Sequence, residues 1–178
     1  MNSFIGLGRP WTQYQSQVVI DNQKVMINIL DNALSNLGED DPTWSYHRYN
    51  VFGLTSPTQV FYDLYNELRG FVYDYTNAEY LWIQSWVNYH KQDQVLKRHN
   101  HGWPIHGYIS IRPHNTETVF DNYKIQNEVG KVYIGPGNNP HHVEVLEPFD
   151  TPRITLGFDI TDRPSKVNAN LGMIPFPK

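Results

Sequence analysis

The chain of 178 residues is long enough for one domain with a hydrophobic core, since 39% of its residues are hydrophobic and 14% are aromatic. This composition excludes a disordered chain. The formal net charge is −4 and no run rich in lysine and arginine occurs, so we do not expect a nucleic-acid partner. Cysteine is absent, which excludes a disulfide scaffold and a zinc-finger site.

The N-terminal stretch MNSFIGLGRPWTQYQ lacks the basic start and the long apolar segment of a secretory signal. No apolar run approaches the roughly 20 residues that a membrane helix needs. We therefore expect a soluble, cytoplasmic protein with no membrane partner. The sequence leaves its oligomeric state open.

The first part of the chain carries a helical pattern that ends near residue 37. Asp21 or Asn22 is suited to cap this helix, and Gly38 to end it. Apolar residues recur between them at helical spacing: Met26, Ile29, Leu30, Ala33 and Leu37.

A second helix is predicted to begin after the turn GEDDP and the segment that follows it. Ser56 is the expected N-cap, Pro57 suits the first helical position, and Gln59 completes a capping box. One apolar stripe follows: Val60, Leu64, Leu68, Phe71 and Tyr75. Each of the two helices therefore needs a sheet to cover its apolar face.

From residue 80 onward the pattern changes to short strands rich in β-branched and aromatic residues. The runs are EYLWIQSWVNYH, IHGYISIRP, ETVFDNYKI, GKVYIGP, HHVEVLE and RITLGFDI. Their number and spacing predict a sandwich or a small barrel. The last segment, NLGMIPFPK, contains two prolines and is expected to be irregular. We divide the single domain, 1–178, into a helical front (1–79), a β core (80–160) and a tail (161–178).

Six of the eight histidines lie between residues 99 and 142. In a strand, residues two apart share a face, so His99 and His101 would point the same way with Cα atoms about 7 Å apart. Two imidazoles at that spacing can converge on one metal ion, and a third ligand would have to come from a neighbouring strand.

His141 and His142 are the candidates for this third ligand. In HHVEVL, His141 shares a face with Val143 and Val145, whereas His142 shares the other with Glu144. The face with two valines is the one expected to look inward, which favours His141 as the ligand.

A histidine pair in a β protein can also be incidental, and this alternative stays open. His106 and His114 are interpreted as structural or surface residues, and His47 and His90 carry no signal.

Four motifs of the β region follow one another along the chain: QSWVN (84–88), RHNHGWPIHGYISI (98–111), VYIGPGNNPHHV (132–143) and RITLGFDI (153–160). Together they resemble the iron(II)/2-oxoglutarate-dependent oxygenase superfamily. The similarity is greatest to its small prolyl-hydroxylase-like branch, found in phages and marine bacteria, so a phage-encoded protein acting in the host cytoplasm would fit. The resemblance covers about residues 80–160, and no motif in the helical front matches.

The resemblance implies a mainly β (α+β) fold, a double-stranded β-helix or jelly-roll with N-terminal helices packed on its larger sheet. It also implies an Fe(II) centre whose first ligand is His99 and whose distal ligand is His141. His101 stands where most of the superfamily has Asp or Glu. A third neutral imidazole removes one negative charge from the ligand set, although imidazole binds iron well.

The same resemblance assigns residues to the cosubstrate, 2-oxoglutarate. Arg153 corresponds to the arginine that binds its distal carboxylate, through two parallel charge-assisted hydrogen bonds. Thr155 corresponds to the usual hydroxyl partner. Tyr108 and Asn88 are further candidates for contacts with the cosubstrate. Without the resemblance, a surface arginine near Asp150 would be the simpler interpretation.

The function implied is a dioxygenase that uses O₂ and 2-oxoglutarate to hydroxylate a peptidyl or small-molecule substrate, releasing succinate and CO₂. One alternative is a metal-binding cupin that does not use 2-oxoglutarate and would not require Arg153. Another is a non-enzymatic β-sandwich with a structural or binding role.

Overall fold

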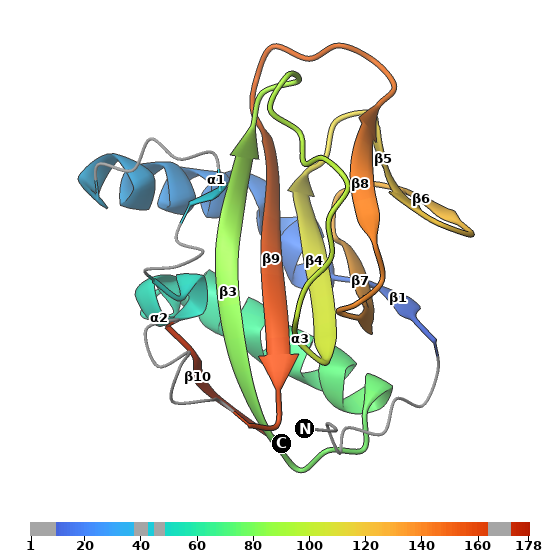
Figure 1. Ribbon diagram of the computed structural model, residues 1–178. Coiled ribbons are helices and arrows are strands. Elements are labelled where there is room, and N and C mark those ends of the chain that lie inside the picture. Colours follow the sequence, from blue (N-terminus) through green and yellow to red (C-terminus); the bar gives the residue numbers. More distant parts are fainter. Residues whose placement is uncertain (1–9, 38–42, 45–48, 164–171) are drawn as a thin grey trace.

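A computed structural model describes residues 10–37, 43–44, 49–163 and 172–178. Within these residues a larger sheet has seven strands, ordered β1-β7-β4-β9-β3-β10 with β2 also paired to β3, and a smaller sheet has three, ordered β6-β5-β8 (Figure 1). The strands are β1 (Thr12–Gln15), β2 (Thr43–Trp44), β3 (Tyr80–His90), β4 (Ile105–Arg112), β5 (Thr116–Phe120), β6 (Lys124–Gln126), β7 (Lys131–Pro136), β8 (His141–Val145), β9 (Arg153–Thr161) and β10 (Ile174–Pro177). The helices are α1 (Gln17–Leu37), α2 (Val51–Thr55) and α3 (Gln59–Tyr75).

The chain passes repeatedly between the two sheets and so forms a double-stranded β-helix, or jelly-roll. Strands β4, β7 and β9 belong to the larger sheet, whereas β5, β6 and β8, which lie between them in sequence, form the smaller one. The segment before β4 extends the smaller sheet, because His99 forms a β-bridge with His141. The predicted mainly β, α+β fold is confirmed, with antiparallel pairing in both sheets and helices on the larger one.

All six strand-rich runs contain strands, and ETVFDNYKI contains two, β5 and β6. The prediction of an irregular C-terminal tail is wrong for residues 174–177, which form β10. Its two prolines are tolerated because β10 is an edge strand that pairs with β3 alone. Strands β1 and β2 were also not expected in the helical front.

The first helix begins earlier than its sequence pattern predicts. Helix α1 starts at Gln17, where the Ser16 hydroxyl accepts a hydrogen bond from the Val19 amide at 3.1 Å and acts as the cap. The two expected caps, Asp21 and Asn22, both lie inside the helix, and Asn22 has non-helical angles (φ −122°, ψ 15°) that mark a kink. Gly38 lies outside the described residues.

The second predicted helix start is also wrong. Asn50 caps the short helix α2 by accepting hydrogen bonds from the amides of Phe52 and Gly53, and Ser56 is the C-cap of that helix. Thr58 precedes α3 and makes no capping hydrogen bond through its side chain. The buried face of α3 keeps three of the five expected residues and is formed by Phe61, Leu64, Leu68, Val72 and Tyr75. Of the two residues that suggested a capping box, Ser56 closes α2 and Gln59 is the first residue of α3.

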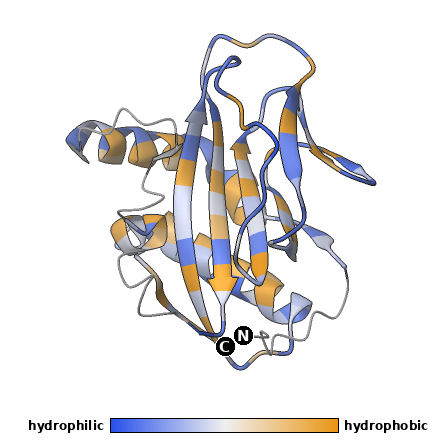
Figure 2. Ribbon diagram, in the orientation of Figure 1, coloured by the Kyte–Doolittle hydropathy of each residue, from blue (hydrophilic) through white to orange (hydrophobic). Residues whose placement is uncertain are grey.

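The helices cover one face of the larger sheet, and the opposite face looks toward the smaller sheet (Figure 1). Hydrophobic and hydrophilic residues alternate along the central strands (Figure 2). The helix-covered side of β9 joins the main hydrophobic core through Ile154, Leu156, Phe158 and Ile160. The residues between them, Arg153, Thr155 and Gly157, line a cavity between the sheets. Polar residues on this side of the strand therefore face the interior, and not water.

No helix in the described part of the chain combines the length and the apolar character needed to cross a membrane.

Candidate metal centre and anion pocket

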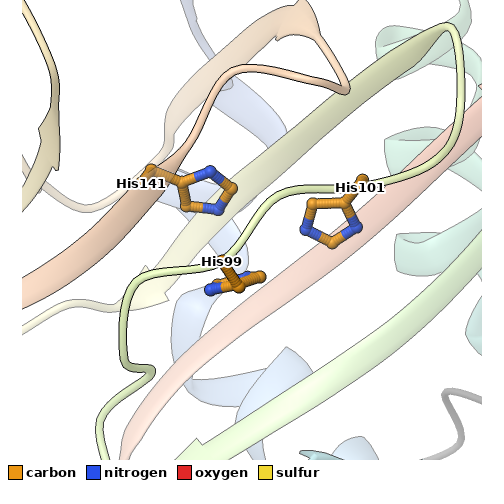
Figure 3. A group of neighbouring side chains, drawn as sticks. All are labelled: His99, His101 and His141. Carbon is orange, nitrogen blue, oxygen red and sulfur yellow. The ribbon is translucent and has the colours of Figure 1, made fainter.

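Three histidines from two segments converge beside the cavity (Figure 3). The ring centroids of His99 and His141 are 4.5 Å apart, those of His99 and His101 are 5.2 Å apart, and those of His101 and His141 are 5.6 Å apart. One nitrogen from each ring lies within 4.8 Å of the corresponding nitrogen of the other two. Three imidazoles at these separations can ligate a single ion.

The hydrogen bonds of these rings leave one nitrogen of each available. In His99 and His141, Nδ1 lies 2.7 and 3.1 Å from the backbone carbonyl oxygen two residues earlier. In His101, Nδ1 lies 3.1 Å from Oδ2 of Asp159. Because a carbonyl or a carboxylate oxygen only accepts, each Nδ1 carries the proton and each Nε2 keeps its lone pair. Metal-binding histidines have this same arrangement.

Burial also favours the neutral form of two of these imidazoles. It lowers the pKa of His141 to about 2, and it lowers the pKa of His99 as well. The Nε2 atom of His101 is buried without a hydrogen-bond partner among the described residues. A buried ring nitrogen left without a hydrogen-bond partner is a position at which a metal ion can bind. The residues present therefore fit a divalent metal.

Backbone pairing brings the two segments together. The amide of His99 donates to the carbonyl of His141 at 3.0 Å, and the reverse bond is 2.9 Å. His101 is held differently, because its amide donates to the carbonyl of Gly137 at 2.8 Å. A Cβ atom at Gly137 would collide with the carbonyl of Trp103, so glycine allows this close approach.

His99 and His101 were expected to lie on a strand, and His142 was expected to point away from them. Residues 99–101 do not form a regular strand, since His99 makes only an isolated bridge. The two rings nevertheless gather on one side. His142 is half-buried and turns away from the cluster, with its Nε2 atom 3.4 Å from Oε1 of Glu144.

A second group of possible ligands adjoins the first and consists of His101, His106 and Asp159. The Nδ1 atom of His106 lies 2.9 Å from Oδ1 of Asp159, and the Nδ1 atom of His101 lies 3.1 Å from Oδ2 of the same carboxylate. All three side chains are buried, and the two rings stack with centroids 3.6 Å apart. Hydrogen bonds already join both carboxylate oxygens to the two Nδ1 atoms. We therefore interpret this group as a hydrogen-bonded support for the neighbouring metal centre.

Asp159 was not predicted from the sequence, although it lies six residues after Arg153 and strand alternation places both on one face. His106 is buried and lines the cavity, so the surface interpretation of this residue is wrong. His114 is half-buried, hydrogen-bonds to the Thr151 carbonyl and lies outside the cluster.

Arg153 is fully enclosed, with an exposed fraction of 2%. Its Nε atom donates to the Thr116 hydroxyl at 3.3 Å, and one terminal nitrogen donates to the Thr155 hydroxyl at 3.4 Å. No carboxylate pairs with it in the part of the chain that the structure describes, which excludes the surface pair with Asp150. Burial lowers the pKa of Arg153 to about 10, so the guanidinium stays charged at neutral pH.

An unpaired buried cation is unfavourable by several kcal/mol, on the order of the penalty for removing any ion from water. Two further polar groups adjoin the guanidinium. Asn88 donates from its Nδ2 atom to the Thr155 hydroxyl at 3.2 Å, and its Oδ1 atom is buried without a partner among the residues described. The Tyr108 hydroxyl makes no well-formed hydrogen bond, and burial raises the pKa of Tyr108 although Thr118 opposes this shift. These groups form a pocket suited to a carboxylate.

The three converging histidines and Arg153 line one cavity of about 230 Å³. Its wall is formed by Trp86, Asn88, Leu96, His99, Asn100, His101, His106, Tyr108, Thr118, His141, Val143, Arg153, Thr155 and Gly157. Trp86 packs on Gly157, where a Cβ atom would overlap the indole ring. The same ring stacks beside His101, with centroids 5.7 Å apart. The cavity therefore combines an apolar wall with a small number of convergent polar groups.

No family model and no curated protein matches this sequence. Solved structures do match. The non-heme alpha ketoglutarate dependent carbocyclase SnoK from nogalamycin biosynthesis has a TM-score of 0.64 and 10% identity, covering 92% of this chain and 85% of its own.

The epimerase SnoN from the same biosynthesis has a TM-score of 0.55 at 8% identity, with 86% of this chain and 76% of SnoN covered. One SnoN structure contains Fe³⁺, alpha ketoglutarate and nogalamycin RO. IDO from Bacillus thuringiensis has a TM-score of 0.52 at 8% identity, covering 87% of this chain and 91% of IDO. At these identities the similarity establishes a shared fold.

Proposed function

We propose that this protein is an Fe(II)/2-oxoglutarate-dependent oxygenase. The observation that carries the proposal is the combination of two features in one cavity. Three imidazoles converge on its wall, with one nitrogen of each within 4.8 Å of the other two, and a buried guanidinium lies on the same wall with no carboxylate partner in the described part of the chain. A metal ion and a dicarboxylate together would satisfy both features, and 2-oxoglutarate is a dicarboxylate that also chelates iron.

In this proposal His99, His101 and His141 hold the metal through their Nε2 atoms. Imidazole is a good ligand for iron, and three protein ligands leave open positions for a chelating cosubstrate and O₂. When bound, Fe(II) with 2-oxoglutarate and O₂ supplies the chemistry of this class: 2-oxoglutarate is oxidised to succinate and CO₂, and one oxygen atom enters a substrate C–H bond. The protein's own part is to bind, orient and exclude water.

The proposed role of Arg153 is to bind the distal carboxylate of 2-oxoglutarate. A guanidinium can donate two parallel hydrogen bonds to a carboxylate, which lysine cannot do. The Thr155 hydroxyl already contacts the guanidinium and Asn88, so it would orient both. Tyr108 lines the same cavity and offers a phenolic proton to a carboxylate oxygen.

The substrate we propose is a peptidyl side chain or a small molecule whose C–H bond becomes hydroxylated. The order of the motifs resembles the prolyl-hydroxylase-like branch, which supports a peptidyl substrate. The nogalamycin compound in the SnoN structure supports a small molecule for a protein of this fold. The apolar wall formed by Leu96, Val143 and Trp86 is suited to either kind of substrate.

The proposal is tested by anaerobic titration with Fe(II) and then with 2-oxoglutarate. Chelation of Fe(II) by the keto-acid end should give a metal-to-ligand charge-transfer band in the visible spectrum. In Arg153→Met the band should require a much higher concentration of 2-oxoglutarate. In Arg112→Met, a change in a β4 residue outside the cavity, it should form as in the wild type.

Two results would contradict parts of the proposal. Absence of the band in the wild-type protein, with Fe(II) bound, would favour a metal-binding protein that does not use 2-oxoglutarate. Absence of Fe(II) binding in untagged protein would favour a non-enzymatic β-sandwich.

A further inference from the structure

Asp159 occupies an unusual position for a carboxylate, because it lies in the interior, next to a proposed metal ligand, without contacting the proposed ion site itself. Its side chain is completely buried. Its two oxygens receive one hydrogen bond each, from Nδ1 of His101 at 3.1 Å and from Nδ1 of His106 at 2.9 Å. No lysine or arginine pairs with it within the described ranges 10–37, 43–44, 49–163 and 172–178. Two imidazole N–H groups are its partners.

This pattern determines where the protons of the two rings lie. A carboxylate oxygen can only accept, so both Nδ1 atoms must donate. Each Nε2 atom then keeps its lone pair, and that of His101 has no partner among the residues described. His106 fixes the second oxygen and stacks on His101 with ring planes 11° apart, which restricts rotation of the carboxylate and of the ligand ring.

We propose that Asp159 is a positioning residue for the metal centre: it holds the Nε2 lone pair of His101 toward the ion and supplies, one ring away, the negative charge that three neutral imidazoles lack. This inference rests on the proposed metal centre and extends it. The corresponding partners of His99 and His141 are backbone carbonyls, whereas the partner of His101 is a carboxylate, the kind of outer partner that orients and strengthens a histidine as a metal ligand. The carboxylate thus acts through a histidine and does not ligate directly.

The decisive variant is Asp159→Asn, which keeps the shape of the side chain. An amide offers one acceptor and one donor, so it can satisfy only one of the two Nδ1–H groups. Binding of Co(II), measured under anaerobic conditions against a competing chelator, should weaken by about 10–100-fold, the usual effect of losing an outer partner of a metal-bound histidine. The matched control is Asp162→Asn, the same change one residue after β9, which should leave Co(II) affinity within about twofold of the wild type. Equal affinity of wild type and Asp159→Asn would overturn the proposal.

A second measurement can be made on the wild-type protein first. Nitrogen-15 spectra of the imidazoles in the metal-free wild-type protein report which ring nitrogen is protonated. We expect His101 and His106 both to carry the proton on Nδ1. In Asp159→Asn, one of the two rings should move its proton to Nε2. A wild-type His101 protonated on Nε2 would contradict the proposal.

These readouts separate this inference from the proposed function. If the protein binds Co(II) tightly but gives no charge-transfer band with Fe(II) and 2-oxoglutarate, the oxygenase assignment fails. The role of Asp159 would then still stand on metal affinity and on the tautomer of His101.

Discussion

The two faces of β9 differ in chemistry although both are buried. All nine residues of this strand are buried. On the helix-covered face, Ile154, Leu156, Phe158 and Ile160 join the main core. On the other face lie Arg153, Thr155, Gly157, Asp159 and Thr161. Burial of the first face stabilises the fold through the hydrophobic effect. Burial of the second face is unfavourable unless its polar groups form hydrogen bonds, either with one another or with a bound ligand.

This difference separates stability from function along a single strand. Substitutions on the core face should change the free energy of unfolding and leave the binding chemistry of the folded fraction intact. Substitutions on the cavity face should change the binding chemistry and leave the free energy of unfolding nearly the same. The two faces of β8 allow the same comparison at the proposed metal centre.

The largest effect is expected at β8. His141→Ala should abolish saturable Co(II) binding, since losing a ligand should exceed the roughly 10–100-fold effect of losing an outer partner. His142→Ala, which changes a residue turned toward Glu144, should retain binding close to that of the wild type. Calorimetric titration of both variants measures this difference. Loss of binding in His142→Ala alone would reverse the assignment of the two histidines.

On the core face of β9, Phe158→Ala should destabilise the protein by about 3–5 kcal/mol, because it removes a fully buried ring and leaves a cavity. Urea denaturation followed by fluorescence measures the loss. Co(II) affinity of the folded protein below the transition should be unchanged. A decrease in affinity matching the decrease in stability would show that the two faces are not separable.

On the cavity face, Arg153→Met should weaken 2-oxoglutarate binding by about 2–5 kcal/mol, the usual effect of removing one partner of a buried charge pair. The free energy of unfolding without cosubstrate should not decrease, since the variant removes a buried charge that has no carboxylate partner among the described residues. Spectral titration and urea denaturation give the two values. Marked destabilisation without loss of cosubstrate affinity would make Arg153 a structural residue.

The smallest effect is expected for Thr155→Val, which keeps the shape of the side chain but cannot accept from Arg153 or Asn88. Loss of such a hydrogen bond is worth about 1 kcal/mol, or roughly fivefold in 2-oxoglutarate affinity. Thr161→Val, the same change on the same face near the strand end, should leave that affinity unaltered. Equal affinities in both variants would argue against an orienting role for Thr155.

The strands were predictable because alternation and β-branched residues are local signals, and all six strand-rich runs contain strands. The ends of the helices were not. Ser56 reads as the start of a helix, yet it closes α2, because Asn50 caps that helix and also donates to the carbonyl of Ile83 in β3. Tertiary contacts of this kind override local capping preference.

The candidate site was predictable in part. The spacing of His99 and His101 and the alternation around His141 are visible in the sequence, and so is the shared face of Arg153 and Thr155. Asp159 lies on that same face but gave no signal of its own, because its partners His101 and His106 lie more than 50 residues earlier.

The β10 strand was not predicted because edge pairing tolerates prolines, which local rules count against a strand.

By itself, the sequence determined which residues alternate along each strand and which side chains can donate, accept or ligate. Only the tertiary structure decided that the polar side of β9 faces the interior, because that outcome depends on the smaller sheet closing over it while the helices cover the other face. The same closure decided the partners of His101 and buried Arg153 where none of the described residues offers it a carboxylate. Side-chain chemistry is local, whereas burial and partnership are properties of the whole fold.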